Sequence, residues 1–317
     1  MSLKSAKLAT FVALCVLLVQ GCATKPATNS ATGPEMVHER FGHAAVTDGK
    51  LIYIIGGGGS SISTLTSIEI YDPDSRTTEL LTDIITPRRY HSAVFDGKES
   101  IYILGGVSIG PNRFRPNYNF EVFNTRTRTV TKLADYKAPT RINTAQFYDG
   151  KIFVLGGTYL TRNGIEYSKW LLVYDLKTQA WSRAKDMPTG KETKSVIHGN
   201  WLYTVGGYDG KNSLTSVERF NVKRNIWETL PSLPKGISAH SIAVINNKII
   251  TFGSYDDLDT SFSYDIKSKV WEKSSIKMQP ARHSSATVLD DMIYVIGGTL
   301  TGKPPHLKSI QSLKHSL

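Results

Sequence analysis

The side chains best suited to binding chemistry in this sequence are cations that recur at similar places along the chain. Several stand just before a short stretch of small and apolar residues, and others lie in loops that follow a glycine pair. Guanidinium groups bind carboxylates in a bidentate manner, so a ring of them would suit an anionic ligand. The alternative is structural, because such a cation can also bond carbonyl and carboxylate oxygens of its own domain. The candidate ligand-binding residues are Arg40, Arg88, Arg89, Arg113, Arg115, Arg141, Arg162, Lys191 and Arg282.

Other kinds of site find less support in the residue pattern. His43 and His91 occupy one position of a repeated motif, which favours packing over metal ligation. Residues 255–259 hold spaced carboxylates but lack the glycine and the distal glutamate of a calcium loop. Glu166 and Glu192 could each act as a base, but the spacing of residues along the chain pairs neither of them with a catalytic partner. We therefore expect no catalytic residue, no metal and no cofactor.

The first 39 residues precede the part of the chain that carries these candidates. Two lysines and an apolar run over residues 8–19 are typical of a signal peptide, and the run is too short for a membrane span. The Gly21-Cys22 pair that follows resembles the lipobox of bacterial lipoproteins, which implies acylation of Cys22, for example with palmitate. The alternative is ordinary secretion with cleavage nearby. We expect a signal peptide at 1–21, an acylated cysteine and flexible tether at 22–39, and a folded domain at 40–317.

The cysteine count and the charge narrow the class of protein further. Cys15 lies in the expected signal peptide and Cys22 at its end, so the mature domain would have no thiol for a disulfide or a metal. Removing Lys4 and Lys7 from 38 basic residues leaves 36 against 27 acidic ones, a net charge of +9. This charge suits a membrane surface or an anionic glycan, and no basic helix argues for nucleic acid. Ala23 after the cysteine resembles the sorting pattern of outer-membrane lipoproteins, which implies the bacterial cell envelope.

The folded part of the chain is a tandem repeat. Six apolar runs, the first at residues 52–55, end in a glycine pair or in Gly-Ser, at intervals of 44 to 51 residues. One such run alone could suggest a phosphate-binding loop, but no Gly-Lys-Ser/Thr follows and no helical period begins there. We expect the glycines to let neighbouring backbones approach closely. They are Gly56, Gly57, Gly105, Gly106, Gly156, Gly157, Gly206, Gly207, Gly253, Gly297 and Gly298.

Each glycine pair is followed by an aromatic residue with Asp or Asn, as at Tyr71-Asp72, and in three units by a tryptophan seven residues later. These tryptophans are Trp181, Trp227 and Trp271. Together the marks resemble the kelch repeat over about residues 40 to 298. The resemblance implies an all-β protein, a six-bladed kelch-type β-propeller with one four-stranded blade per unit, in which the tryptophans fill the gaps between blades.

The sixth unit departs from the pattern. Residues 309–313 can supply a third strand, but no fourth strand or tryptophan follows before the chain ends. A closing strand counted back from Arg40 would lie near residues 28–33, which form strands poorly. The last blade is therefore expected to be either incomplete, with three strands, or weakly closed by the N-terminal segment.

The connections between strands divide between two faces of the expected propeller. The connections from the first strand to the second and from the third to the fourth are short and share one face. The connections from the second strand to the third, such as residues 107–119 and 158–169, are long. They share the opposite face with the connections between blades. We call this opposite face the long-loop face. Because function concentrates on variable loops held by a rigid scaffold, we expect the site there, at the mouth of the central channel.

The expected function is a lipid-anchored, cell-envelope module that binds a protein or an anionic glycan rather than an enzyme. The alternative is a carbohydrate isomerase or mutarotase for an acidic sugar, because sialic-acid mutarotases are six-bladed periplasmic kelch propellers. Those enzymes have a glutamate after a second-strand glycine, and Asp209 or Asp256 would have to replace it here. The partners expected are the ligand and a membrane, without nucleic acid, and the sequence leaves the oligomeric state open.

Overall fold

The structure, a computed structural model, describes residues 34–110, 114–135 and 141–314, and these residues form strands and loops without a helix. The predicted signal peptide, the predicted lipid attachment at Cys22, most of the predicted tether, and Arg113 lie outside the described residues. No helix long and apolar enough to cross a membrane occurs in the described ranges.

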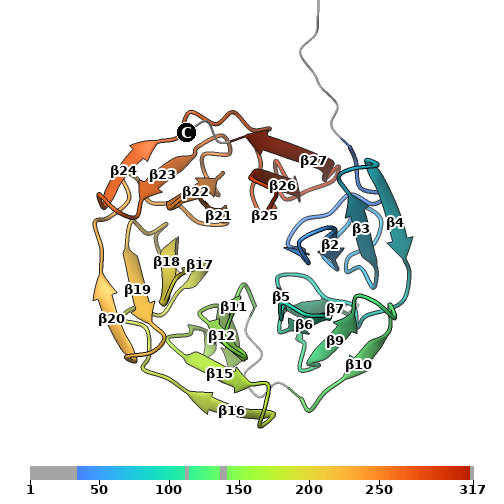
Figure 1. Cartoon of the computed structure of the whole chain (residues 1–317), viewed down its shortest axis with the longest axis horizontal. Coiled ribbons are helices and arrows are strands. Elements are labelled where there is room, and N and C mark those ends of the chain that lie inside the picture. Colours follow the sequence, from blue (N-terminus) through green and yellow to red (C-terminus); the bar gives the residue numbers. More distant parts are fainter. Residues whose placement is uncertain (1–33, 111–113, 136–140, 315–317) are drawn as a thin grey trace, which may run out of the picture. The chain divides into compact units, whose positions relative to one another are not determined.

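Six antiparallel sheets stand around a central axis, as Figure 1 shows, and each sheet corresponds to one sequence repeat. Blade one holds β1 (Ala44–Thr47), β2 (Ile52–Ile55), β3 (Ile68–Asp72) and β4 (Thr77–Leu81). Blade two holds β5 (Ser92–Phe95), β6 (Ser100–Leu104), β9 (Glu121–Asn124) and β10 (Val130–Lys132). Blade three holds β11 (Thr144–Tyr148), β12 (Lys151–Leu155), β15 (Leu171–Asp175) and β16 (Ala180–Arg183).

The second half of the ring repeats this order. Blade four holds β17 (Glu192–His198), β18 (Trp201–Tyr208), β19 (Val217–Asn221) and β20 (Ile226–Thr229). Blade five holds β21 (Ser241–Ile245), β22 (Lys248–Phe252), β23 (Phe262–Asp265) and β24 (Val270–Lys273). Blade six holds β25 (Ser285–Leu289), β26 (Met292–Gly298) and β27 (Leu307–Lys314). The prediction of an all-β, six-bladed propeller is confirmed.

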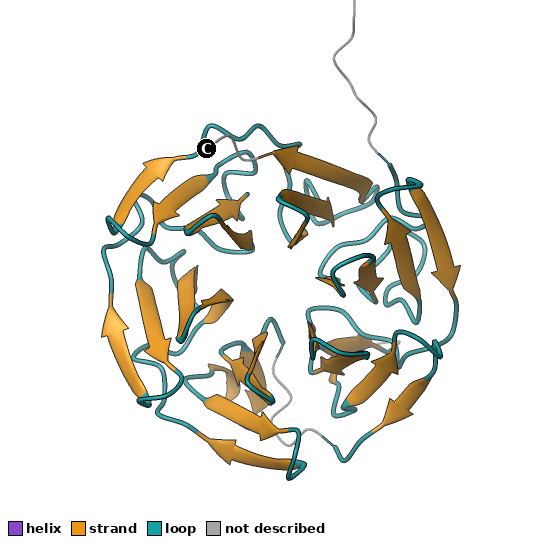
Figure 2. Cartoon of the chain, in the orientation of Figure 1, coloured by secondary structure: helices purple, strands orange, loops and turns teal. Residues whose placement is uncertain are grey.

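Two long connections carry a hairpin of their own. In blade two β7 (Val107–Ile109) pairs with β8 (Phe114–Pro116), and in blade three β13 (Thr158–Thr161) pairs with β14 (Gly164–Tyr167). Both hairpins join the second strand of their blade to the third. Figure 2 shows the other connections as loops between radially ordered strands, the first strand of each blade lying nearest the axis.

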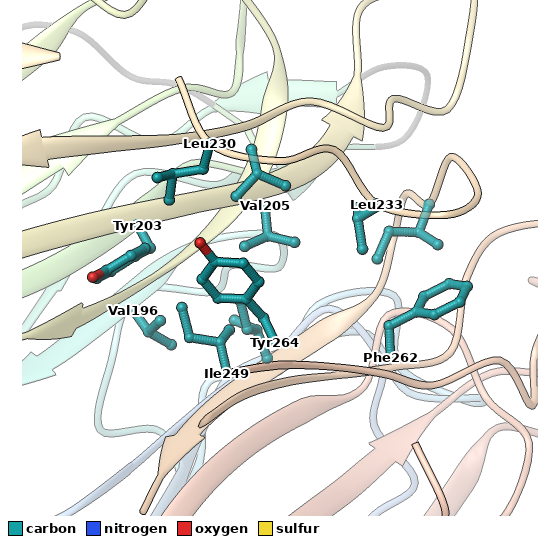
Figure 3. Packing of buried hydrophobic residues seen from close by; sticks show 11 residues of the cluster. Val196, Tyr203, Val205, Leu230, Leu233, Ile249, Phe262 and Tyr264 are labelled. Atoms are coloured by element: carbon teal, nitrogen blue, oxygen red, sulfur yellow. The ribbon is translucent and has the colours of Figure 1, made fainter. Parts of the chain in front are cut away.

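The hydrophobic core lies between blades rather than in one centre. Figure 3 shows the cluster in which Val196 and Tyr203 of blade four face Ile249 and Tyr264 of blade five. Similar clusters bury residues of every neighbouring pair of sheets, because a single sheet cannot cover both of its apolar faces. Each blade is thus held by its two neighbours, and the ring gives the long-loop face a rigid base.

Glycine is needed where a blade meets its neighbour near the axis. Gly56 has φ +55°, and a Cβ there would lie 2.8 Å from the carbonyl oxygen of Arg88 in blade two. Gly253 has φ +71°, and a Cβ there would overlap the carbonyl oxygen of Ala281 in blade six. Any side chain at these two positions would collide with the next blade's backbone.

The tryptophans lie on the outermost strands and are only partly buried, so they fill less of the gap between blades than the sequence suggested. Their rings pack on the aromatic residue of the third strand, as Trp227 does on Phe220 at a centroid distance of 5.2 Å. The Trp227 indole N–H also donates a 2.8 Å hydrogen bond to the Lys185 carbonyl after the outer strand of blade three. The tryptophan therefore joins two blades by a polar contact as well as by packing.

Blade six is closed by the N-terminal segment, one of the two expected outcomes. Pro34, Glu35 and Met36 run beside β27: Ile310 N–H donates to the Pro34 carbonyl at 2.8 Å, and Met36 N–H donates to the Lys308 carbonyl at 2.7 Å. The closing residues lie just after the stretch 28–33 suggested by the sequence, and residues 34–39, expected in the tether, take part in the folded domain. The pairing is short, and the buried Met36 side chain anchors it in the cluster between blades six and one.

Candidate functional site

The predicted cations fall into two neighbouring positions at the start of the innermost strands. Arg40, Arg88 and Lys191 occupy the first, which we call the inner position, and their side chains point into their own blades. Arg89, Arg141 and Arg282 occupy the next residue along the chain, which we call the mouth position. Arg141 itself lines the opening of the channel, and so does the residue that follows each of the three arginines.

The inner cations are fully buried and paired. Arg40 donates to Glu69 on β3 from Nε at 3.0 Å and from Nη2 at 2.7 Å, and to the Gly56 carbonyl at 2.7 Å. Lys191 donates to Glu218 on β19 at 2.6 Å. Arg88 pairs in the same way with Glu121 on β9, and burial lowers the pKa of Arg88 to about 10 although Glu121 opposes the shift. No surface of these three cations is open to a ligand, so the structural alternative describes them.

The mouth cations lie among aromatic rings. The Arg89 guanidinium carbon is 5.1 to 5.3 Å from the ring centroids of Phe41, Tyr90 and Phe114. Arg282 lies 3.9 Å over the Tyr255 ring and donates to the Tyr255 carbonyl at 2.9 Å. Such cation–aromatic contacts orient a guanidinium and leave its charge available.

Backbone geometry separates the two positions. The residue after the mouth position has a left-handed conformation in five blades, with φ values of 54° to 59°; it is Gly42, Tyr90, Ile142, Ala239 or His283. This left-handed residue can donate its N–H to the carbonyl of the equivalent residue in the preceding blade. Tyr90 donates in this way to the Gly42 carbonyl at 2.6 Å, and Gly42 donates to the His283 carbonyl at 2.8 Å. Left-handed backbone at non-glycine residues is strained and persists where the surroundings impose it.

Between the mouth cations lies a cavity of about 500 Å³. Aromatic and ionisable groups from several blades line it, among them Tyr90, Arg141, Glu192, Lys194, Tyr255 and His283. Arg141 Nη2 lies 3.2 Å from Glu192 Oε1, and burial raises the pKa of Glu192 although Arg141 opposes the shift. Burial also lowers the pKa of His283 to about 3, so its ring is neutral near pH 7. A cavity with cations and aromatic walls suits a small anion or an acidic group of a larger ligand.

Lys194 is a cavity residue that the sequence reasoning missed. It stands at the repeat position of His43 and His91, so an alignment of the repeats would have shown a lysine in place of a histidine. Burial lowers the pKa of its ammonium, although Glu192 acts in the opposite direction.

The remaining candidates lie elsewhere. Arg115 and Arg162 are exposed on the two hairpins of the long connections. His43 and His91 are buried against the preceding blade, where the Cε1 of His91 would lie 2.9 Å from a Cβ on Gly56. Among the described residues, no group of three or more His, Cys, Asp or Glu side chains could hold a metal ion.

The long connections also expose apolar side chains. Of the nine large apolar side chains that are exposed in the described part of the chain, seven belong to connections between the second and third strands. Five blades contribute to this set, which we call the apolar loop residues: Ile62, Phe114, Tyr118, Leu160, Ile165, Tyr255 and Leu300. They share the face on which the cavity opens, since Tyr255 belongs to both.

These features place the chain among the β-propellers that carry a cavity at the channel mouth. Residues 42–254 match the model of the KLHDC2/KLHL20/DRC7 Kelch-repeats domain, and the chain belongs to the kelch-repeat family.

Several kelch proteins are similar to the chain. The Kelch-like protein terF of Aspergillus terreus is 28% identical over 243 residues, 69% of this chain and 51% of that protein. The human Kelch-like protein 38 is 27% identical over 170 residues, 51% of this chain and 29% of that protein. Kelch domain-containing protein 10 of Xenopus tropicalis is 26% identical over 306 residues, 82% of this chain and 71% of that protein. The chain thus spans about half of the first of these relatives and less than a third of the second.

Proposed function

We propose that this kelch propeller is a non-enzymatic binding module of the bacterial cell envelope that captures a protein through its long-loop face. The observation that carries the proposal is the gathering of the apolar loop residues on the face where the cationic cavity opens. Exposed apolar side chains that gather on one face mark interaction sites, and aromatic residues and arginine are enriched in protein interfaces.

The charge of this face defines the partner more closely. Arg89, Arg141 and Arg282 surround the mouth, and the whole chain carries a formal net charge of +11. An acidic segment of a protein would complement the cations, while the apolar loop residues would bury its apolar neighbours. An anionic glycan is the other ligand that suits this charge.

The binding proposal is tested with variants of the loop face. Replacing Leu160 and Ile165 on the β13–β14 hairpin by serine should weaken binding of an acidic protein ligand by roughly tenfold, or about 1.4 kcal/mol. The triple variant R89A/R141A/R282A should remove the salt-dependent part of the affinity. The measurement is biolayer interferometry against immobilised acidic proteins and glycans at two salt concentrations. Val270→Ser, an exposed apolar change on outer strand β24, is the matched control. Equal affinities of all variants would exclude this face.

We also propose that the propeller is anchored to the outer membrane through an acylated Cys22. The support is the sequence pattern of two lysines, an apolar run and Gly21-Cys22. Labelling of cells with an alkyne-bearing palmitate should mark the wild-type protein, and Cys22→Ser should abolish the label and release the protein into the soluble fraction. Labelling of the serine variant would contradict the anchor.

A second candidate function rests on the cavity alone. Glu192 beside Arg141 could exchange a proton with an acidic sugar that Arg141 binds, as an isomerase or mutarotase requires. The Asp209 carboxylate instead accepts hydrogen bonds from the backbone of its own turn, at Lys211 and Asn212. Exchange of sialic acid anomers above the uncatalysed rate, followed by NMR, tests this candidate, and loss of the exchange in Glu192→Gln assigns the base.

A further inference from the structure

Blade four breaks the repeat at the mouth. In the other five blades the residue after the mouth position is left-handed, whereas the equivalent Thr193 lies within the extended strand β17. The pairing of β17 with β18 also shifts between Glu192 and Lys194. Such irregularities re-aim side chains and often lie beside active sites.

The extended backbone turns two side chains in the same direction. Residues two apart on a strand share one face, so Glu192 and Lys194 both line the cavity. The Thr193 hydroxyl between them points the other way and donates to the Val205 and Gly206 carbonyls, at 3.2 and 3.1 Å. An amine and a carboxyl group are thereby brought to the same cavity.

Lys194 lies close to the propeller axis. It lines both the mouth cavity and the second cavity, about 440 Å³, that continues along the innermost strands. Its charge acts on histidines of four other blades: His43, His91, His240 and His283. Only a position near the centre of the ring is close to all four.

The Lys194 amine is unpartnered within the described structure, where it makes no hydrogen bond or ion pair. Lys191, three residues earlier and fully buried, instead bonds Glu218 Oε2 at 2.6 Å and Ser216 Oγ at 2.9 Å. Lys194 is partly buried and lines the cavity. A desolvated amine without an ion-pair partner holds its proton weakly, and such lysines serve as nucleophiles toward carbonyl groups.

We propose that Lys194 forms a reversible imine with a small 2-oxo acid held in the mouth cavity. Lys194 takes the carbonyl carbon, while the guanidinium group of Arg141, which lines the same cavity, takes the carboxylate. Glu192 supplies the proton, because its Oε1 accepts hydrogen bonds from Arg141 and Thr158 while Oε2 accepts none in the described part of the chain. The inference rests on the proposed function only in using the same cavity.

The reaction balances without an oxidant or reductant. The free amine attacks the carbonyl carbon, a C–N bond forms, and the carbonyl electron pair moves to oxygen, which takes up a proton as nitrogen loses one. Glu192 then protonates the hydroxyl group, the C–O bond breaks and one water leaves. The products are a protonated imine on Lys194 and water, and hydrolysis reverses each step.

The test uses pyruvate as the probe and cyanoborohydride to reduce any imine to a stable amine. We expect mass spectrometry of the full chain to show one adduct, and peptide mapping to place it on Lys194. Lys194→Arg, which keeps the positive charge but cannot form the imine, should abolish the adduct. Glu192→Gln should slow its formation roughly a hundredfold. Lys235→Arg, an exposed lysine elsewhere on the chain, is the control and should label like the wild type.

Two results would overturn the proposal: an adduct spread over exposed lysines with none on Lys194, or saturable binding of pyruvate without an adduct. Melting curves of each variant show whether a lost adduct reflects lost folding. Capture of a protein by the loop face is measured separately with Lys194→Arg. If the wild type captures the protein but forms no adduct with pyruvate, the imine proposal alone is refuted. If the wild type forms the adduct but captures no protein, the binding-module proposal alone is refuted.

Discussion

The three inner cations are stabilised by carboxylates of the third strand. Arg40 with Glu69, Arg88 with Glu121, and Lys191 with Glu218 repeat the same arrangement in three blades. A buried ion pair contributes little over an apolar pair of the same size, but loss of one partner leaves an uncompensated charge. Substitution of a single partner in one of these pairs should therefore destabilise its blade strongly.

Glu69→Gln should lower the free energy of unfolding by roughly 3–5 kcal/mol, because it leaves the buried Arg40 charge unpaired. The measurement is urea denaturation followed by tryptophan fluorescence. Asp257→Asn removes the partner of Lys235 in an exposed pair and should cost no more than about 1 kcal/mol. Similar losses in the two variants would show that burial does not decide the effect.

Buried histidines should make the protein less stable in acid. Burial is the main cause that lowers the pKa of His43 and of His240 to about 3, from about 6.5 in the unfolded chain. Below pH 6.5 the unfolded chain therefore binds protons that the folded chain does not, and stability falls with pH. Each histidine should contribute about 2 kcal/mol of loss between pH 6.5 and 5.

Urea unfolding at pH 7 and pH 5 measures this loss, and His240→Asn should reduce the difference between the two values by the share of one histidine. An unchanged pH dependence in the variant would contradict the assignment of His240 as a buried neutral group.

The sequence singled out cations at the start of the innermost strands but could not separate neighbouring residues. Arg88 and Arg89 are adjacent and chemically identical, yet one lies inside its blade and the other at the mouth. The left-handed backbone at Tyr90 and the glutamate on a distant strand decide this, and neither leaves a local pattern at the arginines. Lys194 was missed because its function depends on the departure of blade four from the repeat.

At the scale of the elements, the outermost strands are joined to their neighbours by single side chains. Trp227 on β20 and Trp271 on β24 each donate an indole N–H to a carbonyl of the preceding blade, Lys185 at 2.8 Å and Pro231 at 3.0 Å. The indole also covers the aromatic residue of its own third strand. The kelch tryptophan is thus a connector between blades in this protein.

Trp227→Phe should keep most of the ring packing and lose the hydrogen bond, with a loss of about 1 kcal/mol in unfolding free energy. Trp227→Ala loses both and should cost roughly 3 kcal/mol, the lower end for a buried tryptophan, because the side chain is partly exposed. Thermal melts followed by circular dichroism compare the two. Equal losses would mean that the ring contributes nothing beyond the bond.

At the scale of the whole molecule, stability depends on how the ring closes. In the described part of the chain Pro34 to Met36 pair with the outer edge of β27, and Met36 fills a cluster with Tyr71 of blade one and Tyr294 of blade six. The first and last blades meet there, so the Met36 side chain belongs to the core cluster that closes the ring.

Met36→Ala should lower the free energy of unfolding by roughly 2–5 kcal/mol, because it leaves a cavity at the closure. Val37→Ala, the neighbouring exposed residue, should change it by less than about 0.5 kcal/mol. Chemical denaturation of both variants is the measurement. A loss confined to Val37→Ala would place the closure elsewhere.

The propeller itself was predictable because the same sequence motif occurs six times, and each copy predicts the same four-stranded blade. The closure was predicted only in outline: the sixth repeat showed that a strand was missing, but the short segment that replaces it carries neither the glycine pair nor the aromatic residue. Residues 35 and 309 pair because the ring brings them together, and neither segment carries a local sequence pattern that predicts the pairing.

The closure also constrains the order of folding. Glu35 pairs with Ser309, 274 positions later, so residue 309 must be synthesised before the ring can shut. Until then the apolar flank of blade one has no neighbour on one side, and each new blade exposes the flank that the next will cover. A nascent chain therefore presents aggregation-prone surface throughout its synthesis, and its demand for chaperones should end only when β27 meets the N-terminal segment.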